Sequence, residues 1–151
     1  MTGRDRMIDV SHTVEHGMVT LARVPTGHAG AIDRLELTEA DVRGRAVLVH
    51  TGWDRHWGTE RYFDGHPYLT GELAQWLVSA GAVLVGIDSL NIDGIATRER
   101  PVHSTLLGQD VPVVEYLRGL EALPDRGSRF FAVPVKVKGF GTFPVRAFAL
   151  V

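Results

Sequence analysis

Two residues late in the chain, His103 and Glu115, carry side chains that a divalent metal ion prefers. They lie twelve positions apart in the stretch PVHSTLLGQDVPVVEYL. A neutral imidazole and a carboxylate are ligands that suit zinc or manganese. A histidine just before a helix and a glutamate in the first turn of that helix can face one point, so the pair is a candidate half of a metal site. Spacing alone is not specific, and without other ligands it favours a structural role for both residues.

The other histidines show no metal-binding pattern. None of them has the H-E-x-x-H spacing of a helical zinc site. His12 and His16 are four positions apart, but their segment is typical of a strand followed by a turn, where this spacing need not bring the rings together. The histidines outside the candidate pair are His12, His16, His28, His50, His56 and His66. Each of them, taken alone, is expected to be a surface or hydrogen-bonded structural residue.

Two aspartates, Asp88 and Asp93, flank the segment SLNI. The apolar run before Asp88 is typical of a buried strand. Ligands of parallel α/β sheets gather beyond the carboxyl ends of the strands, which makes Asp88 a candidate site residue. The alternative is a polar loop in which the aspartates make local hydrogen bonds. The sequence leaves both interpretations open.

Composition and motifs exclude several other kinds of chemistry. The chain has no cysteine, so disulfides, thiolate nucleophiles and cysteine-ligated metals are excluded. No serine lies in a G-x-S-x-G elbow, and the glycine-rich stretch 139–144 fits a turn better than a phosphate loop. A formal net charge of −2 indicates neither nucleic acid nor a membrane as a partner. With no cysteine and no apolar leader or membrane segment, we expect a cytoplasmic protein.

The clearest element is a helix predicted over residues 69–81. Apolar residues recur there at i, i+3, i+4 and i+7, and Gly81 is a typical end signal. The residues of this stripe are Leu73, Trp76, Leu77 and Ala80. Strands are predicted before and after the helix, at 45–53 and 82–88, so the three elements make a βαβ unit with a parallel pair.

The remaining elements complete a mixed α/β fold. A second helix is predicted by Val113, Leu117 and Leu120, with Asp110 as its cap and Pro112 in its first turn. Pro134 and Pro144 favour sheet edges, or positions at which no backbone N–H is needed. The other expected elements are a strand at 7–14, a loop at 21–37, a one-turn helix start at 37–45 and strands at 129–139 and 143–151. We expect one domain over residues 1–151.

Several stretches together resemble the cyclase family, which includes bacterial kynurenine formamidase. They occur in the family's order and cover most of the chain. The matching stretches are IDVSHTVEHGM, VLVHTGW, AVLVGIDSLNID, HSTLLGQDVPVVEYLRGLEAL and FFAVPVKVKGFGTFPVRAFA. The resemblance implies the swivelling β/β/α fold, and it implies that His103 and Glu115 help to bind a catalytic divalent metal, zinc or manganese.

One family segment has no counterpart here. The family pattern H-x-G-T-H-x-D-x-P-x-H supplies most metal ligands and a proton-shuttling histidine, but the chain passes from EHGMVT directly to LARVPTGH. An internal deletion is therefore expected near 20–23. His28, Asp33 or His12 could replace the lost groups if the shortened loop folds into the gap. The expected pocket residues are His28, Asp88 and Trp53. Trp53 could stack on an aromatic substrate or lie in the core. The sequence identifies no catalytic residue.

The resemblance implies a metal-dependent hydrolase that uses metal-activated water on a small amide. N-formylkynurenine or a related aryl or cyclic amide is the expected substrate class. The alternative is a catalytically inactive relative that acts as a binding or oligomerising protein. Loss of the segment would leave sheet edges uncovered, so we expect a homo-oligomer.

Overall fold

The computed structural model describes residues 6–10, 19–25, 30–135, 137–139 and 141–151. Within these residues the chain forms two sheets and several short helices. The strands are β1 (Met7–Asp9), β2 (Val19–Pro25), β3 (Ala31–Ile32), β4 (Ala46–His50), β5 (Tyr68–Leu69), β6 (Leu84–Ile87), β7 (Val113–Val114), β8 (Arg126–Pro134) and β9 (Val145–Leu150). The α-helices are α1 (Glu39–Val42), α2 (Gly71–Ala80) and α3 (Pro101–Leu107), and the 3₁₀ helices are η1 (Trp53–His56), η2 (Glu60–Phe63) and η3 (Leu120–Ala122).

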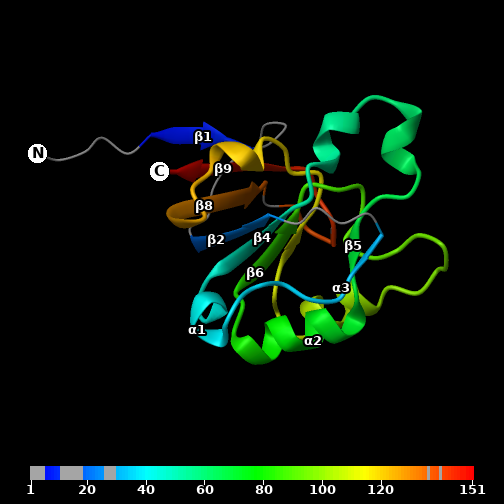
Figure 1. Ribbon diagram of the computed structural model, residues 1–151, viewed down its shortest axis with the longest axis horizontal. Coiled ribbons are helices and arrows are strands. Elements are labelled where there is room, and N and C mark those ends of the chain that lie inside the picture. Colours follow the sequence, from blue (N-terminus) through cyan, green and yellow to red (C-terminus); the bar gives the residue numbers. More distant parts are fainter. Residues whose placement is uncertain (1–5, 11–18, 26–29, 136, 140) are drawn as a thin grey trace, which may run out of the picture.

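The larger sheet of the described residues has seven strands in the order β1-β9-β8-β2-β4-β6-β7 (Figure 1). Strands β2, β4, β6 and β7 run parallel to their neighbours in this series, whereas β8 pairs antiparallel with both β2 and β9. The smaller sheet consists of β3 and β5. The mixed α/β fold predicted from the sequence is confirmed.

Alternating residues of the central strands supply two separate cores. Val47 and Val49 of β4 belong to the cluster that α2 and α3 cover, while Ala46 and Leu48 belong to a second cluster that includes Phe130 of β8. Successive side chains of a strand point to opposite faces, so the uninterrupted apolar run of β4 is explained by cover on both faces. In Figure 1, α2 and α3 lie together beside β6.

The predicted helix at 69–81 is confirmed as α2. The Thr70 hydroxyl accepts a hydrogen bond from the backbone N–H of Leu73 at 3.2 Å, which satisfies one of the free donors at the helix start. Gly81 ends the helix with a left-handed φ of 86°. The βαβ unit is confirmed as well, because β4 and β6 are parallel neighbours on either side of α2 in the chain.

The predicted second helix is wrong. The helix of this region, α3, begins at Pro101 and ends at Leu107, and Val113 and Val114 form β7 beside β6. Asp110 has a φ of 56°, unlike a helix cap, which needs extended backbone. The β-branched valines pair with an open strand edge, and this tertiary pairing overrides the helical spacing of the apolar residues.

One other prediction needs correction, and for Pro134 the second of the two predicted alternatives holds. The stretch 21–37 is not a loop throughout, because residues 21–25 belong to β2, which hydrogen-bonds to β4 and β8. The strand pairing of β2 on both of its sides outweighs the tendency of the nearby proline and glycines to form a loop. Pro134 does not mark an edge strand, since β8 lies inside the sheet; it is the last residue of its strand, where no further N–H is needed. Residues 11–14 of the predicted first strand lie outside the described residues.

Among the described residues, no helix has the length and apolar character required to cross a membrane.

Candidate functional site

The loop that follows β6 organises the candidate site. It runs from Asp88 to Asp93, and both aspartate side chains are buried. Asp88 faces the loop after β4: its Oδ1 accepts hydrogen bonds from the Thr51 N–H at 2.8 Å and hydroxyl at 2.6 Å, and its Oδ2 accepts from the Gly52 N–H at 2.7 Å. Burial raises the pKa of Asp88, and these hydrogen bonds oppose the rise.

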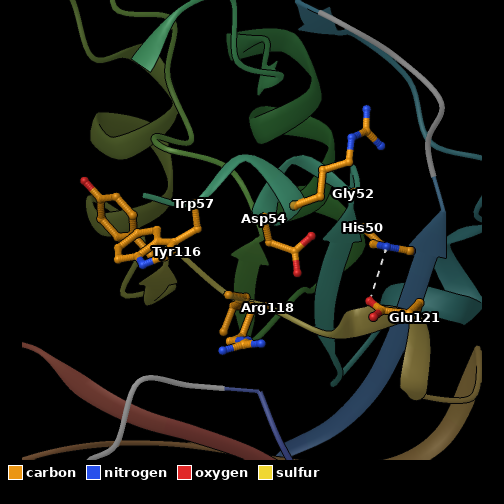
Figure 2. Close-up of a pocket in the computed structure, with 9 residues that line it drawn as sticks. His50, Gly52, Asp54, Trp57, Tyr116, Arg118 and Glu121 are labelled. Carbon is orange, nitrogen blue, oxygen red and sulfur yellow. Dashed lines mark ion pairs between the residues drawn. The ribbon is translucent and has the colours of Figure 1, made fainter. Parts of the chain in front are cut away.

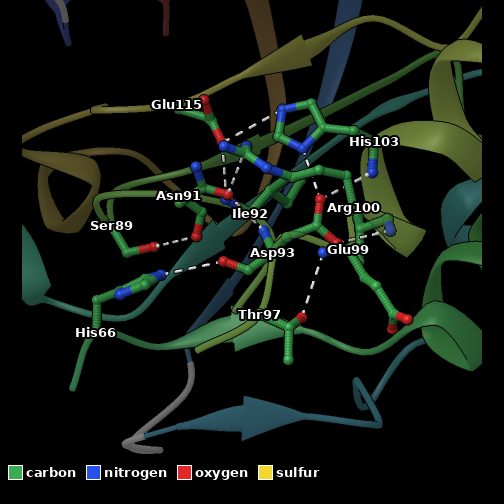
Figure 3. A network of polar contacts seen from close by, with 11 residues as sticks. His66, Ser89, Asn91, Ile92, Asp93, Thr97, Glu99, Arg100, His103 and Glu115 are labelled. Carbon is green, nitrogen blue, oxygen red and sulfur yellow. Dashed lines mark hydrogen bonds and ion pairs between the residues drawn. The ribbon is translucent and has the colours of Figure 1, made fainter. Parts of the chain in front are cut away.

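Asp93 faces the opposite direction, toward the start of α3. Its Oδ1 accepts a hydrogen bond from the backbone N–H of Val102 at 2.7 Å, and its Oδ2 accepts from the backbone N–H of His103 at 3.1 Å. The same Oδ2 lies 2.6 Å from His103 Nδ1 (Figure 3). One carboxylate thus holds both the helix start and the imidazole.

His103 and Glu115 converge, which agrees with the interpretation that the two side chains can face one point. His103 Nε2 lies 3.5 Å from Glu115 Oε1 (Figure 3). Their setting differs from the prediction, because His103 lies inside α3 and Glu115 directly follows β7. Glu115 Oε1 also accepts a hydrogen bond from the backbone N–H of Ile92 at 2.7 Å. About a fifth of each side chain is exposed, 22% for His103 and 19% for Glu115, so both can be reached by a small ligand.

The distance between the two side chains fits a shared metal ion. Two zinc ligands that each lie about 2.1 Å from the ion at a tetrahedral angle are about 3.4 Å apart. The Asp93 contact occupies His103 Nδ1 and leaves Nε2 as the ring nitrogen available to an ion. The described part of the chain contains no group of three or more histidine, aspartate or glutamate residues arranged to hold an ion. The residues present therefore fit part of a ligand set.

A mostly apolar cavity of about 640 Å³ borders this pair. It lies between the region of β7 and the turn that connects β8 and β9. Its walls include Leu107, Val113 and Val145, and His103, Glu115 and Thr142 contribute polar side chains. A volume of several hundred Å³ with few polar groups is typical of a small-molecule site.

A second cavity of about 540 Å³ lies near the end of β4 (Figure 2). His50 Nε2 is 3.9 Å from Glu121 Oε2 and 4.0 Å from the buried Asp88 Oδ2. Trp57 and Tyr116, which are both exposed, meet edge to face with their ring centroids 6.0 Å apart. The carboxylate of Asp54 accepts a hydrogen bond from the Gly119 N–H at 2.8 Å. This cavity is bordered by ion pairs and aromatic edges, and it contains neither His103 nor Glu115.

Asp88 and Trp53, the expected pocket residues that the structure describes, do not line the cavity beside His103 and Glu115. Asp88 is fully buried and supports the loop after β4. Trp53 is only 4% exposed, and its indole N–H donates to the Tyr62 carbonyl at 3.0 Å, so its position agrees with the core alternative. His28 lies outside the described residues, as does His12. Asp33 borders a different cavity, beside α2.

The sequence did not identify the residues that hold His103 and Glu115 in place. The role of Asp93 depends on a contact with His103 across ten positions, and that of Ile92 on its backbone N–H. No spacing rule predicts either contact, because the loop between Asp93 and Pro101 has no regular structure. One weak indication of this role was present in the sequence, because Asp93 is the second aspartate in the loop after the buried strand β6.

The chain is similar in sequence to proteins of one family. The cyclase family model matches residues 1–94, more than half of the chain. Kynurenine formamidase from Bordetella avium is 30% identical over 110 residues, which cover 72% of this chain and 50% of the relative. Isatin hydrolase from Roseibium aggregatum is 28% identical over 120 residues, 72% of this chain and 45% of the relative.

Solved structures show the same fold. An isatin hydrolase bound to the product analogue thioisatinate aligns with a TM-score of 0.76 at 21% identity, covering 89% of this chain and 60% of that one. A structure described as a potential metal-dependent hydrolase with cyclase activity aligns with a TM-score of 0.60 at 25% identity, covering 89% and 64%. The chain spans about half the length of the curated relatives that it matches, from 45% to 58%. On the match to more than half of its residues, the chain belongs to the cyclase family.

Proposed function

We propose that the protein is a metal-dependent hydrolase of small aryl or cyclic amides, and that His103 and Glu115 supply two ligands of its divalent metal ion. The observation that supports this most directly is the 3.5 Å approach of His103 Nε2 to Glu115 Oε1 at the edge of an apolar cavity. The relatives named kynurenine formamidase and isatin hydrolase support the substrate class, since both names denote hydrolases of aryl amides.

The metal, when bound, would supply an activated water at neutral pH. The residues of this chain would hold the ion, orient its histidine ligand and bind the substrate. His103 and Glu115 would hold the ion from one side, and Asp93 would orient the imidazole through Nδ1. The apolar wall formed by Leu107, Val113 and Val145 would receive an aromatic ring and exclude bulk water from the amide.

A second candidate function follows from the incomplete ligand set. Catalytic zinc normally has about three protein ligands and an open position. The described residues place two groups at the site and include no cluster of three. On this second proposal the protein is an inactive relative that binds a small molecule or another chain, with His103 and Glu115 as part of a polar network.

Metal content and hydrolysis separate the two proposals. The purified protein, dialysed against zinc or manganese, is analysed for bound metal and assayed with N-formylkynurenine and isatin. The hydrolase proposal predicts about one ion per chain, lost in His103→Ala, and amide hydrolysis that stops with the same substitution. His56→Ala is the matched control, because its ring contacts Trp53 at a centroid distance of 4.7 Å and takes no part in the His103 contacts.

The two outcomes are distinct. Metal retained by His56→Ala and lost by His103→Ala supports the proposed ligand. A wild-type protein that holds no metal and hydrolyses neither amide above the buffer rate contradicts the hydrolase proposal and favours the second candidate.

A further inference from the structure

We propose that Asp93 is a positioning residue: its buried carboxylate holds His103 in the tautomer whose Nε2 carries the free lone pair and faces Glu115. The identity of the ion that would bind at Nε2 rests on the proposed function. The orientation of the ring does not, because every contact that sets it lies within the described protein.

The contact between Asp93 and His103 determines where the imidazole proton lies. Asp93 Oδ2 and His103 Nδ1 are 2.6 Å apart, slightly less than the about 2.7–2.9 Å of charge-assisted N–H···O bonds. Both Asp93 oxygens already accept backbone N–H groups, so the carboxylate acts as an acceptor toward the ring as well. Nδ1 therefore donates to Oδ2, and in the neutral ring Nε2 is left with its lone pair.

The carboxylate cannot turn to release the ring without losing other bonds. Asp93 is 1% exposed, and its two oxygens also accept the backbone N–H groups of Val102 and His103. Its own backbone is held on both sides: its N–H donates to Asn91 Oδ1 at 2.9 Å, and its carbonyl accepts from His66 Nε2 at 3.1 Å (Figure 3). The side chain therefore has one orientation, set by loop and helix together.

Neighbouring residues of one loop orient both candidate ligands. Asp93 holds His103, and the N–H of Ile92 donates to Glu115 Oε1 at 2.7 Å. The protein's own hydrogen bonds therefore bring the His103 imidazole and the Glu115 carboxylate together without a bound ion. Carboxylates that accept from the second nitrogen of a metal-binding histidine typically affect metal affinity by about 10–100-fold.

Asp93→Ala is the test, because it removes the acceptor at His103 Nδ1. Asparagine is unsuitable, because its amide oxygen could still accept from both the ring and the His103 N–H, as Asp93 Oδ2 does. Without the carboxylate, Nε2 still faces Glu115 Oε1 at 3.5 Å, so the proton of the neutral ring is expected on Nε2, where it blocks a ligand. Asp88→Ala is the matched control, since Asp88 is equally buried in the same loop and contacts Thr51 and Gly52 instead.

The tautomer is read directly from ¹⁵N–¹H correlations of the imidazole in metal-free protein at mildly alkaline pH, with His103→Gln to assign the signal. Wild type and Asp88→Ala are expected to show the proton on Nδ1, and Asp93→Ala to show it on Nε2. Zinc affinity of Asp93→Ala, measured by competition with a chelator, is expected to fall by about 10–100-fold. A role of Asp93 limited to the helix start would lower thermal stability and leave the tautomer unchanged.

Each result decides the proposal. A wild-type ring protonated on Nε2 overturns it, whether or not the Asp93→Ala protein folds. An unchanged tautomer in folded Asp93→Ala also overturns it. If wild type binds no zinc yet shows the predicted change of tautomer, the positioning role holds and the hydrolase proposal fails separately.

Discussion

His103 Nε2 and Glu115 Oε1 lie 3.5 Å apart, although His103 comes from helix α3 and Glu115 from the residue after strand β7. The two positions are connected by Leu107 to Val113, which carry the chain from the end of the helix to the start of the strand. Because β7 pairs in parallel with β6, Glu115 arrives beside the loop that holds His103. The candidate site is therefore a product of strand pairing.

Two substitutions of Glu115 separate metal binding from folding. Glu115→Gln keeps an oxygen that can accept from Ile92 N–H, so it should leave stability nearly unchanged while it weakens metal binding by removing the charge. Glu115→Ala leaves that N–H unpaired, which costs about 1–3 kcal/mol. Urea unfolding and zinc titration of both variants check this. Equal zinc affinity of wild type and Glu115→Gln would contradict the ligand role.

The stability of the protein should depend on pH through Asp41. Hydrogen bonds from the Thr38 N–H and hydroxyl lower the pKa of Asp41 below its ordinary value, and Arg126 nearby lowers it further. A lowered pKa means that the carboxylate stabilises the fold above the ordinary pKa, and that this contribution is lost as the pH falls through the folded-state value. Asp41→Asn should be less stable than wild type at neutral pH.

The same comparison under acid conditions provides the check. Denaturant unfolding of wild type and Asp41→Asn at a series of pH values should give curves that converge below the ordinary aspartate pKa of about 3.9. A gap between the two proteins that stays constant from neutral to strongly acid pH would show that the charge of Asp41 makes no contribution.

Gly86 should tolerate no side chain. A Cβ at this position would lie 2.6 Å from Leu48 Cδ2 and 2.8 Å from Leu117 Cδ1, both in the packed second core. Overpacking of this kind costs about 1–3 kcal/mol, so Gly86→Ala should lower the free energy of unfolding by that amount. Gly141→Ala is the control, since a Cβ there meets no atom within 4 Å. Thermal unfolding of both variants gives the comparison.

We also propose that the protein self-associates near β7. This strand ends the larger sheet and pairs with β6 within the described part of the chain, and Leu107 and Val135 nearby are 52% and 47% exposed. Uncovered strand edges and apolar surface favour pairing with another chain. Sedimentation velocity at rising concentration should show dimers or larger species.

Charged substitutions at this edge should shift the equilibrium toward monomer. Leu107→Glu and Val135→Glu are expected to do so, while Ile95→Glu, at a position 51% exposed in the loop before α3, should have no effect. A wild-type protein that sediments as a single monomeric species over the whole concentration range would refute self-association.

Local pattern was sufficient for the parts of the fold whose residues interact with near neighbours. The stripe from Leu73 to Ala80, with Thr70 before it and Gly81 after it, predicted α2, because capping and helical periodicity act within a few residues. The apolar runs of β4 and β6 predicted buried parallel strands for a similar reason. The order of matching stretches indicated the cyclase family and the pair His103 and Glu115.

Tertiary structure decided what depends on distant partners. Val113 has a helical spacing to Leu117 and Leu120, but Val113 and Val114 pair with the open edge of β6 as a strand, and α3 forms earlier in the chain. Trp53 and Asp88, which resembled pocket residues, are buried by contacts to Tyr62 and to Thr51. The bond from Asp93 to His103 had no counterpart in the sequence pattern. Sequence periodicity reports on neighbours a few residues away, whereas the geometry of the candidate site depends on hydrogen bonds between segments that only the folded sheet brings together.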